Sequence, residues 1–117
     1  MAFVRVYTGT DRQSRFEDLP IPFYPNDTML PGTFSQNSRE ISFRRQPVGL
    51  VQDWHTAPRR QYIITLTGQA EIEVGNGEIR VFKPGDILLA EDLTGYGHIT
   101  RVVGNESRIS VTIPLDD

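Results

Sequence analysis

Residues 54–98 read WHTAPRRQYIITLTGQAEIEVGNGEIRVFKPGDILLAEDLTGYGH, a pattern typical of consecutive antiparallel strands. Short runs in which apolar and polar residues alternate are separated by Gly, Pro and Asn, as in strands rather than helices. In the clearest run, Ile72 and Val74 alternate with glutamates, and Gly75-Asn76-Gly77 leads into a second alternating run at residues 78–81. An Asn-Gly turn between two such runs predicts a β-hairpin whose charged side chains face outward.

The same alternation continues on both sides of this stretch. Turns recur at intervals of about 8 to 12 residues, which favours an all-β sandwich or barrel. The predicted strands are residues 3–7, 41–44, 48–55, 61–66, 70–74, 78–81, 87–90, 98–103 and 109–113. Residues 11–18 are mostly polar and are expected to form a short helical turn or an ordered loop.

Residues 1–39 are predicted to carry the first strand and a proline-rich arm, ahead of a barrel formed by residues 40–117. The arm contains prolines, which forbid a long regular element, and large apolar residues, which argue against a disordered linker. These residues are Pro20, Pro22, Pro25 and Pro31, and Phe23, Tyr24, Met29, Leu30 and Phe34. We expect the arm to pack on the barrel or on a second subunit. Because a monomer rarely exposes so many large apolar side chains, we predict a homodimer.

Length and composition exclude several classes of protein. A chain of 117 residues forms one domain, and the absence of cysteine excludes disulfides and thiolate chemistry. The longest strongly apolar run, residues 87–90, is far shorter than the roughly 20 residues that span a bilayer. The first ten residues lack the features of a secretory signal, so a cytoplasmic location is expected. With a net charge of −3 and a single lysine, no nucleic-acid partner is expected.

These residues resemble the cupin superfamily, whose members are small jelly-roll β-barrels. The first cupin motif has a glycine, two histidines one residue apart, a carboxylate or glutamine, and a closing glycine. Its counterparts here are Gly49, His55, Gln61 and Gly68, with Ala57 in place of the second histidine. The second motif is similar to the turn Pro84-Gly85-Asp86 followed by His98, which lies two residues later than usual. The resemblance covers about residues 40–113 and implies a single-domain cupin barrel like those of small bacterial cupins of mostly unassigned activity.

The resemblance also implies a candidate metal site. Cupins usually hold iron, manganese, nickel or zinc with three histidines and a carboxylate inside the barrel. The corresponding residues here are His55, His98 and Gln61, which supply two imidazoles and an amide oxygen. A carboxylate from Asp53, Glu91 or Asp92 could complete the set. Two histidines without a metal, each held by hydrogen bonds, are the alternative.

Acid–base chemistry without a metal is equally compatible with these residues. Histidine titrates near neutral pH, and a hydrogen-bonded carboxylate fixes its tautomer and stabilises the imidazolium. The candidate pairs are His55 with Asp53 or Glu91, and His98 with Asp92. Such a site could move a proton next to a carbonyl group, as an isomerase, epimerase, cyclase or dehydratase does.

Arg59 and Arg60 are candidate substrate-binding residues because they follow the His55 strand and precede Gln61. A guanidinium there could bind a substrate carboxylate or phosphate through two parallel hydrogen bonds and so select a small anion. The alternative is a surface salt bridge to the hairpin glutamates.

Asp53, Trp54 and Tyr96 complete the set of substrate-binding candidates. Strand alternation puts Asp53 on the same face as His55. Trp54 points to the opposite face, which suits a subunit contact or the second sheet. Tyr96 lies between two glycines and is predicted to act as a lid residue.

Two classes of function follow from this pattern. The first is a cupin-type enzyme acting on a small organic molecule inside the barrel, by oxygenase-like divalent-metal chemistry or by proton transfer. The second is a non-catalytic small-molecule-binding cupin, such as a sensor or accessory protein. Turnover of an identified ligand distinguishes the first from the second.

Overall fold

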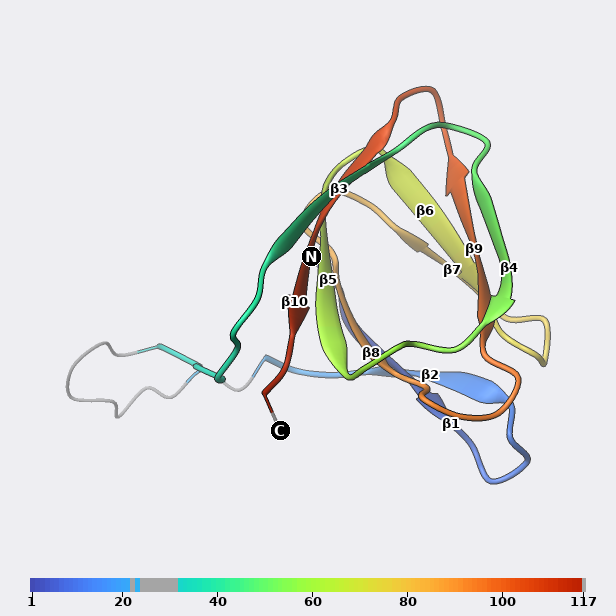
Figure 1. Ribbon diagram of the computed structural model, residues 1–117, viewed down its shortest axis with the longest axis horizontal. Coiled ribbons are helices and arrows are strands. Elements are labelled where there is room, and N and C mark those ends of the chain that lie inside the picture. The colour runs from blue at the N-terminus through green and yellow to red at the C-terminus, as the bar shows by residue number, and fades with distance from the viewer. Residues whose placement is uncertain (22, 24–31, 117) are drawn as a thin grey trace.

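The computed structural model describes residues 1–21, 23 and 32–116, and their regular structure consists of strands (Figure 1). The strands are β1 Phe3–Thr8, β2 Ser14–Asp18, β3 Ser42–Gln46, β4 Val51–His55, β5 Gln61–Thr67, β6 Gln69–Glu73, β7 Ile79–Phe82, β8 Ile87–Glu91, β9 His98–Val103 and β10 Arg108–Pro114. Over these residues, no helix is long and apolar enough to cross a membrane.

The strands form two sheets that face each other across the barrel interior (Figure 1). In the described chain, one sheet has the order β2-β1-β8-β5-β10-β3 and the other has the order β4-β9-β6-β7. Neighbouring strands are antiparallel except β1 and β8, which run parallel. The predicted all-β barrel is confirmed.

Most predicted strands form close to the expected positions. The hairpin of β6 and β7 pairs Glu73 with Ile79 across the Asn-Gly turn, as its alternation indicates. The helical turn or loop predicted for residues 11–18 is wrong in its second half, because Ser14–Asp18 pairs with β1 as an edge strand. The predicted start of the strand at residue 48 is also wrong. Gly49 has a φ of 90°, and the amide of Leu50 donates to the carbonyl of Pro47, so the chain turns before β4 begins at Val51.

The apolar core occupies only part of the barrel. Its buried side chains come from β1, β6, β7 and β8 and from the segments beside β4 and β6, and they are Val4, Val6, Ala57, Ile72, Val74, Phe82, Leu88 and Ala90. On β3 and β10 the alternation is the reverse of that expected for a core. Ser110 and Thr112 are buried, whereas Phe43 is 69% exposed. The barrel interior is therefore apolar on one side and polar on the other.

The outer face of the six-stranded sheet carries a mainly apolar groove of about 220 Å³. It is lined by Phe3, Ile21, Phe34, Gln36, Tyr62, Ile64, Ile87, Ile113 and Leu115. Ile21 and Phe34 belong to the predicted arm, so this part of the arm packs on the barrel. The other arm residues named above lie outside the described residues, apart from Pro20 and the exposed Phe23.

The homodimer remains a prediction, and we expect the second copy to cover this outer face beside the groove, where Ile41 and Phe43 are exposed. Replacing Phe43 with Asp removes a large apolar side chain from each copy, which is worth about 1.5–3 kcal/mol per side chain. Because a symmetric contact contains Phe43 from both copies, the free energy is lost twice, and the dimer dissociation constant should rise at least about 100-fold. Light scattering after size-exclusion chromatography measures this, with Val81→Asp on β7 as the control. An unchanged mass for Phe43→Asp would place the contact elsewhere.

Candidate functional site

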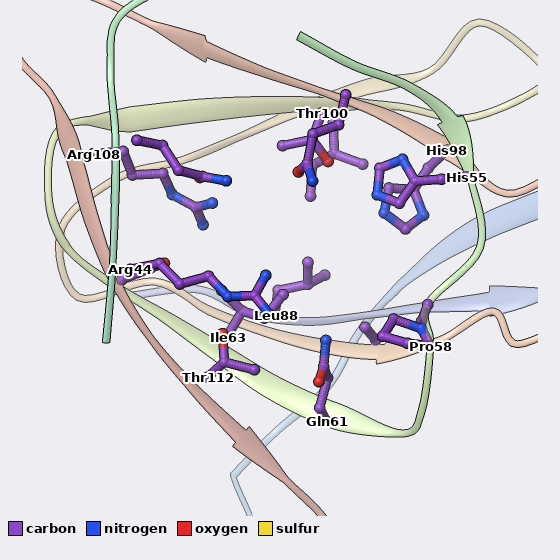
Figure 2. A pocket seen from close by; sticks show the side chains of 16 residues that line it. Arg44, His55, Pro58, Gln61, Ile63, Leu88, His98, Thr100, Arg108 and Thr112 are labelled. Carbon is purple, nitrogen blue, oxygen red and sulfur yellow. The ribbon is translucent and has the colours of Figure 1, made fainter. Parts of the chain in front are cut away.

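A cavity of about 260 Å³ occupies the polar side of the barrel interior (Figure 2). Its walls are formed by Arg44, Gln46, Gln52, His55, Ala57, Pro58, Gln61, Ile63, Ile72, Leu88, Ala90, His98, Thr100, Arg108, Ser110 and Thr112. At about 30 Å³ per water molecule, the space matches eight or nine waters and suits a small organic molecule. Ile72, Leu88 and Ala90 belong to both the cavity wall and the core, so one wall is rigid and apolar.

His98 is held by a buried carboxylate. The Nδ1 atom of His98 lies 2.6 Å from Oδ2 of Asp92, and the side chains are only 6% and 0% exposed. The same Oδ2 accepts a hydrogen bond from the hydroxyl of Ser14 at 2.6 Å. Ser14 comes from β2, the segment that was expected to be a helical turn or a loop, so this strand completes the support of His98. The predicted pairing of His98 with Asp92 is present.

His55 lies beside His98 but is held differently. The two residues are partners in the β4–β9 register, and their ring centroids are 4.5 Å apart. The Nδ1 atom of His55 lies 2.8 Å from the backbone carbonyl of Asp53. The Asp53 carboxylate instead accepts from the amide of Trp54. The predicted carboxylate partner of His55 is therefore replaced by a backbone carbonyl.

These hydrogen bonds set the tautomer of both rings. A carboxylate or carbonyl oxygen can only accept, so Nδ1 of each histidine carries a proton. In the neutral imidazole the lone pair is then on Nε2. Both histidines line the cavity, so it has two neighbouring imidazoles that can accept a proton at Nε2.

A bulge in β4 corrects the predicted strand faces. The register of β4 with β9 shifts between Gln52 and His55, so simple alternation fails there. Gln52 and His55 both line the cavity, whereas Asp53 is exposed. Asp53 and His55 were predicted to share a face, and this prediction is wrong. Trp54 points away from the cavity, as expected.

Tyr96 is not placed as a lid over this cavity. Together with Trp54, Gln13 and Gly75 it lines a separate outer hollow. Its loop is tied down, because the amide of Tyr96 donates to the carbonyl of Arg12 at 3.0 Å. The two glycines beside Tyr96, which suggested mobility, instead allow close backbone contacts with Arg12 and His55.

Glu91, Arg59 and Arg60 are not among the residues lining the cavity. Glu91 follows Ala90 on β8 and so faces the outer side, where it binds Nε of Arg60 at 2.6 Å. Arg59 pairs with Glu40. The predicted alternative of a salt bridge to the hairpin glutamates is also wrong, since Arg101 binds Glu71 and Glu73.

Arg108 and Arg44 are cavity residues that the sequence interpretation missed. Arg108 is 4% exposed, and its Nη2 donates to the hydroxyl of Thr65 at 3.0 Å. Its Nε has no partner among the described residues. Burial, followed by the positive charge of Arg44, lowers the pKa of Arg108 to about 10, so Arg108 is still charged at neutral pH. The signal in the sequence was their shared strand parity with Ser42, Gln46, Ser110 and Thr112.

Replacing Arg108 with Met should increase stability. The change removes a buried charge without a carboxylate partner and keeps an apolar chain of similar length, so the free energy of unfolding at pH 7 should rise by about 1–2 kcal/mol. The folded-state pKa lies below the unfolded value, so the wild type should regain part of this difference as the pH rises above 10. Denaturant titration at pH 7 and pH 10.5 measures both effects. A loss of stability in the variant would mean that Arg108 mainly holds the fold together.

His55, His98 and Gln61, the predicted metal ligands, all line the cavity. Their donor set is two imidazole nitrogens and a neutral amide oxygen. No cluster of three or more His, Asp or Glu residues suited to a metal occurs in the described parts of the chain, and Asp92 is bound to His98 and Ser14. This set falls short of the usual three or four strong ligands of a transition metal. The first reaction proposed below therefore uses no metal.

The architecture and its cavity together define an all-β barrel of two facing sheets that encloses a cavity of ligand size. The solved structures with a similar fold include the following two. A cupin 2 conserved barrel domain protein from Salinispora arenicola has a TM-score of 0.55 and 19% identity, over 86% of this chain and 88% of that chain. The cupin domain of Cnp3 from Schizosaccharomyces pombe has a TM-score of 0.51 and 15% identity, over 88% of this chain and 73% of that chain.

The chain therefore has the cupin fold, which confirms the fold implied by the sequence resemblance. No family model matches the sequence, and neither does any curated protein.

Proposed function

We propose that the protein is a small-molecule enzyme that transfers a proton at a carbon next to a carbonyl group, as isomerases, epimerases, cyclases and dehydratases do. The observation that carries this proposal is the buried Asp92–His98 pair at the cavity wall. A carboxylate that accepts from Nδ1 favours the imidazolium formed when Nε2 takes up a proton. His98 also lines the cavity, so the pair lies beside a space of ligand size.

Each residue around the cavity has a role in this reaction. Nε2 of His98 removes a proton from the substrate carbon, and the electron pair moves onto the carbonyl oxygen. Amide and hydroxyl hydrogens of Gln61 and Thr100 can stabilise that oxygen. The proton returns from His98 to the same carbon, or it passes from His98 to Nε2 of the neighbouring His55, which delivers it to another position. The apolar wall excludes water from the enolate.

Hydrogen exchange with solvent tests the proposal before the substrate is known. The protein is incubated in D2O with a mixture of small carbonyl metabolites, and mass spectrometry detects any compound that gains deuterium only when protein is present. One labelled or rearranged compound supports the enzyme. Thermal stabilisation by a metabolite that is neither labelled nor converted supports the alternative of a non-catalytic binding protein and contradicts the proposal.

A metal-dependent reaction is the second candidate, and one observation favours it. Metal-ligating histidines usually donate their other ring N–H to an oxygen, and both His55 and His98 do so here. Elemental analysis of protein purified without chelator measures bound iron, manganese, nickel and zinc. A metal site predicts about one equivalent that disappears in His55→Ala and remains in Arg59→Met. Equal metal content in His55→Ala and wild type would remove this candidate.

A further inference from the structure

The part of the cavity lined from β3 and β10 carries two positive charges and, among the described residues, no negative one. Figure 2 places the guanidinium groups of Arg44 and Arg108 at one side of the cavity and the two imidazoles at the other. Arg108 and Arg44 are diagonal neighbours on adjacent strands, since β10 pairs Arg108 with Gln46 and Ser110 with Arg44. Long side chains in this relation are within reach of each other.

Apart from the exposed Arg12 and Arg45, the other arginines have carboxylate partners. Arg59 pairs with Glu40, Arg60 with Glu91, and Arg101 with two glutamates of the hairpin. Among the described residues, no carboxylate forms an ion pair with Arg44 or Arg108. Within the described part of the chain, the charged group that acts on Arg108 is Arg44, which repels it. Asp92, at the far end, is already bound to His98 and Ser14.

This arrangement is costly for folding alone. A charge held away from water requires compensation, and Arg108 is 4% exposed with only a neutral hydroxyl as hydrogen-bond partner. Its Nε lacks a partner among the residues described. A second arginine facing the same space adds repulsion. An anion between the two guanidiniums would supply the missing acceptors and the missing charge together.

We infer that Arg44 and Arg108 bind an oxyanion group, a carboxylate or a phosphate, of the small molecule that enters the cavity. This inference rests on the proposed function, because it takes the same cavity as the substrate site, and it gives the substrate class as a small organic anion. The hydroxyl of Thr65 holds one Nη of Arg108 and so orients the guanidinium plane. The anionic group of the substrate would lie at the arginines and its reacting carbon at the histidines. The carbonyl group and the anionic group are therefore separated along the substrate.

Isothermal titration calorimetry with inorganic phosphate, acetate and malonate tests the inference, with sodium chloride used to match ionic strength. We expect saturable binding of at least one oxyanion with a Kd of about 1 mM or tighter. Arg108→Met and Arg44→Met should each weaken it about 10- to 100-fold, because a charged hydrogen-bonding partner is lost. Phosphate binding alone would assign a phosphate ester, and binding of acetate or malonate alone would assign a carboxylate.

The controls separate this inference from the proposed function. Arg59→Met removes an arginine outside the cavity and should bind the anion as the wild type does, while Arg108→Lys keeps the charge without the planar fork and should bind with intermediate strength. Equal affinity in wild type and Arg108→Met, or no saturable binding of any of the three anions, would overturn the inference. If an uncharged metabolite exchanges deuterium at the same rate in wild type and Arg108→Met, the anion site is contradicted and the proposed proton-transfer enzyme is supported. If Arg108→Met loses anion binding but the wild type labels no metabolite, the anion site is supported and the proposed enzyme activity is contradicted.

Discussion

The rate of deuterium exchange into the substrate is expected to fall about 100- to 10,000-fold when His98 is replaced by Gln. Glutamine has a similar reach and keeps a hydrogen bond with Asp92, but its amide cannot accept a proton near neutral pH. The loss should appear in kcat with KM nearly unchanged, because the group acts on the transition state rather than on ground-state binding. Exchange kinetics on the labelled metabolite, measured well below the melting temperature, give both constants.

Asp92 acts through His98, so its variant provides a separate test of the pair. Asp92→Asn preserves volume but cannot stabilise the imidazolium by charge, and kcat should fall about 100-fold or more. Ser14→Ala removes only a hydroxyl that donates to the same oxygen, and a smaller loss is expected. Wild-type kcat in His98→Gln would contradict the assignment of the base. A change in KM alone for Asp92→Asn would indicate that Asp92 shapes the cavity without aiding proton transfer.

The sequence predicted the fold well because strand alternation and turn chemistry are local properties. The Asn-Gly hairpin and the strand beginning at His98 form where their residues indicate. Residues 14–18 escaped prediction because a short polar edge strand is stabilised by its neighbour. Ser14–Asp18 forms only as the partner of β1.

The candidate site was only partly predictable, for two physical reasons. Alternation shows that the two faces of a strand differ, but it does not show which face lies inside the barrel. Arg44 and Arg108 were missed because the polar faces of β3 and β10 line the cavity. The position of charged residues next to a motif residue in the sequence was also misleading. Arg59 and Arg60 are adjacent to the Gln61 motif residue, yet both pair with glutamates outside the cavity. His55, Gln61 and His98 were predicted correctly as cavity residues because they match positions of the cupin motifs.

The second large effect is expected at Gly97, directly before His98. Its φ is 75°, and a Cβ built there lies 2.0 Å from the carbonyl oxygen of His55. Gly97→Ala should therefore lower the free energy of unfolding by about 3–5 kcal/mol, of which about 1–2 kcal/mol is the left-handed backbone of a residue with a side chain. The remainder comes from the clash, since the neighbouring atom belongs to the backbone of a paired strand. Denaturant unfolding measures the total.

Gly104→Ala separates the two contributions to this loss. Gly104 also has positive φ, at 90°, but a Cβ built there meets no atom within 4 Å. Its variant should lose only the backbone part and retain exchange activity. Gly97→Ala, in contrast, must displace either β9 or the carbonyl end of β4, and that shift moves His55 relative to His98. The positions of the two imidazoles depend on a close contact between β4 and β9 that only glycine permits. An equal loss of stability in both variants would mean that the two strands can move apart at little cost. The contact at Gly97 would then not fix the geometry of the histidine pair.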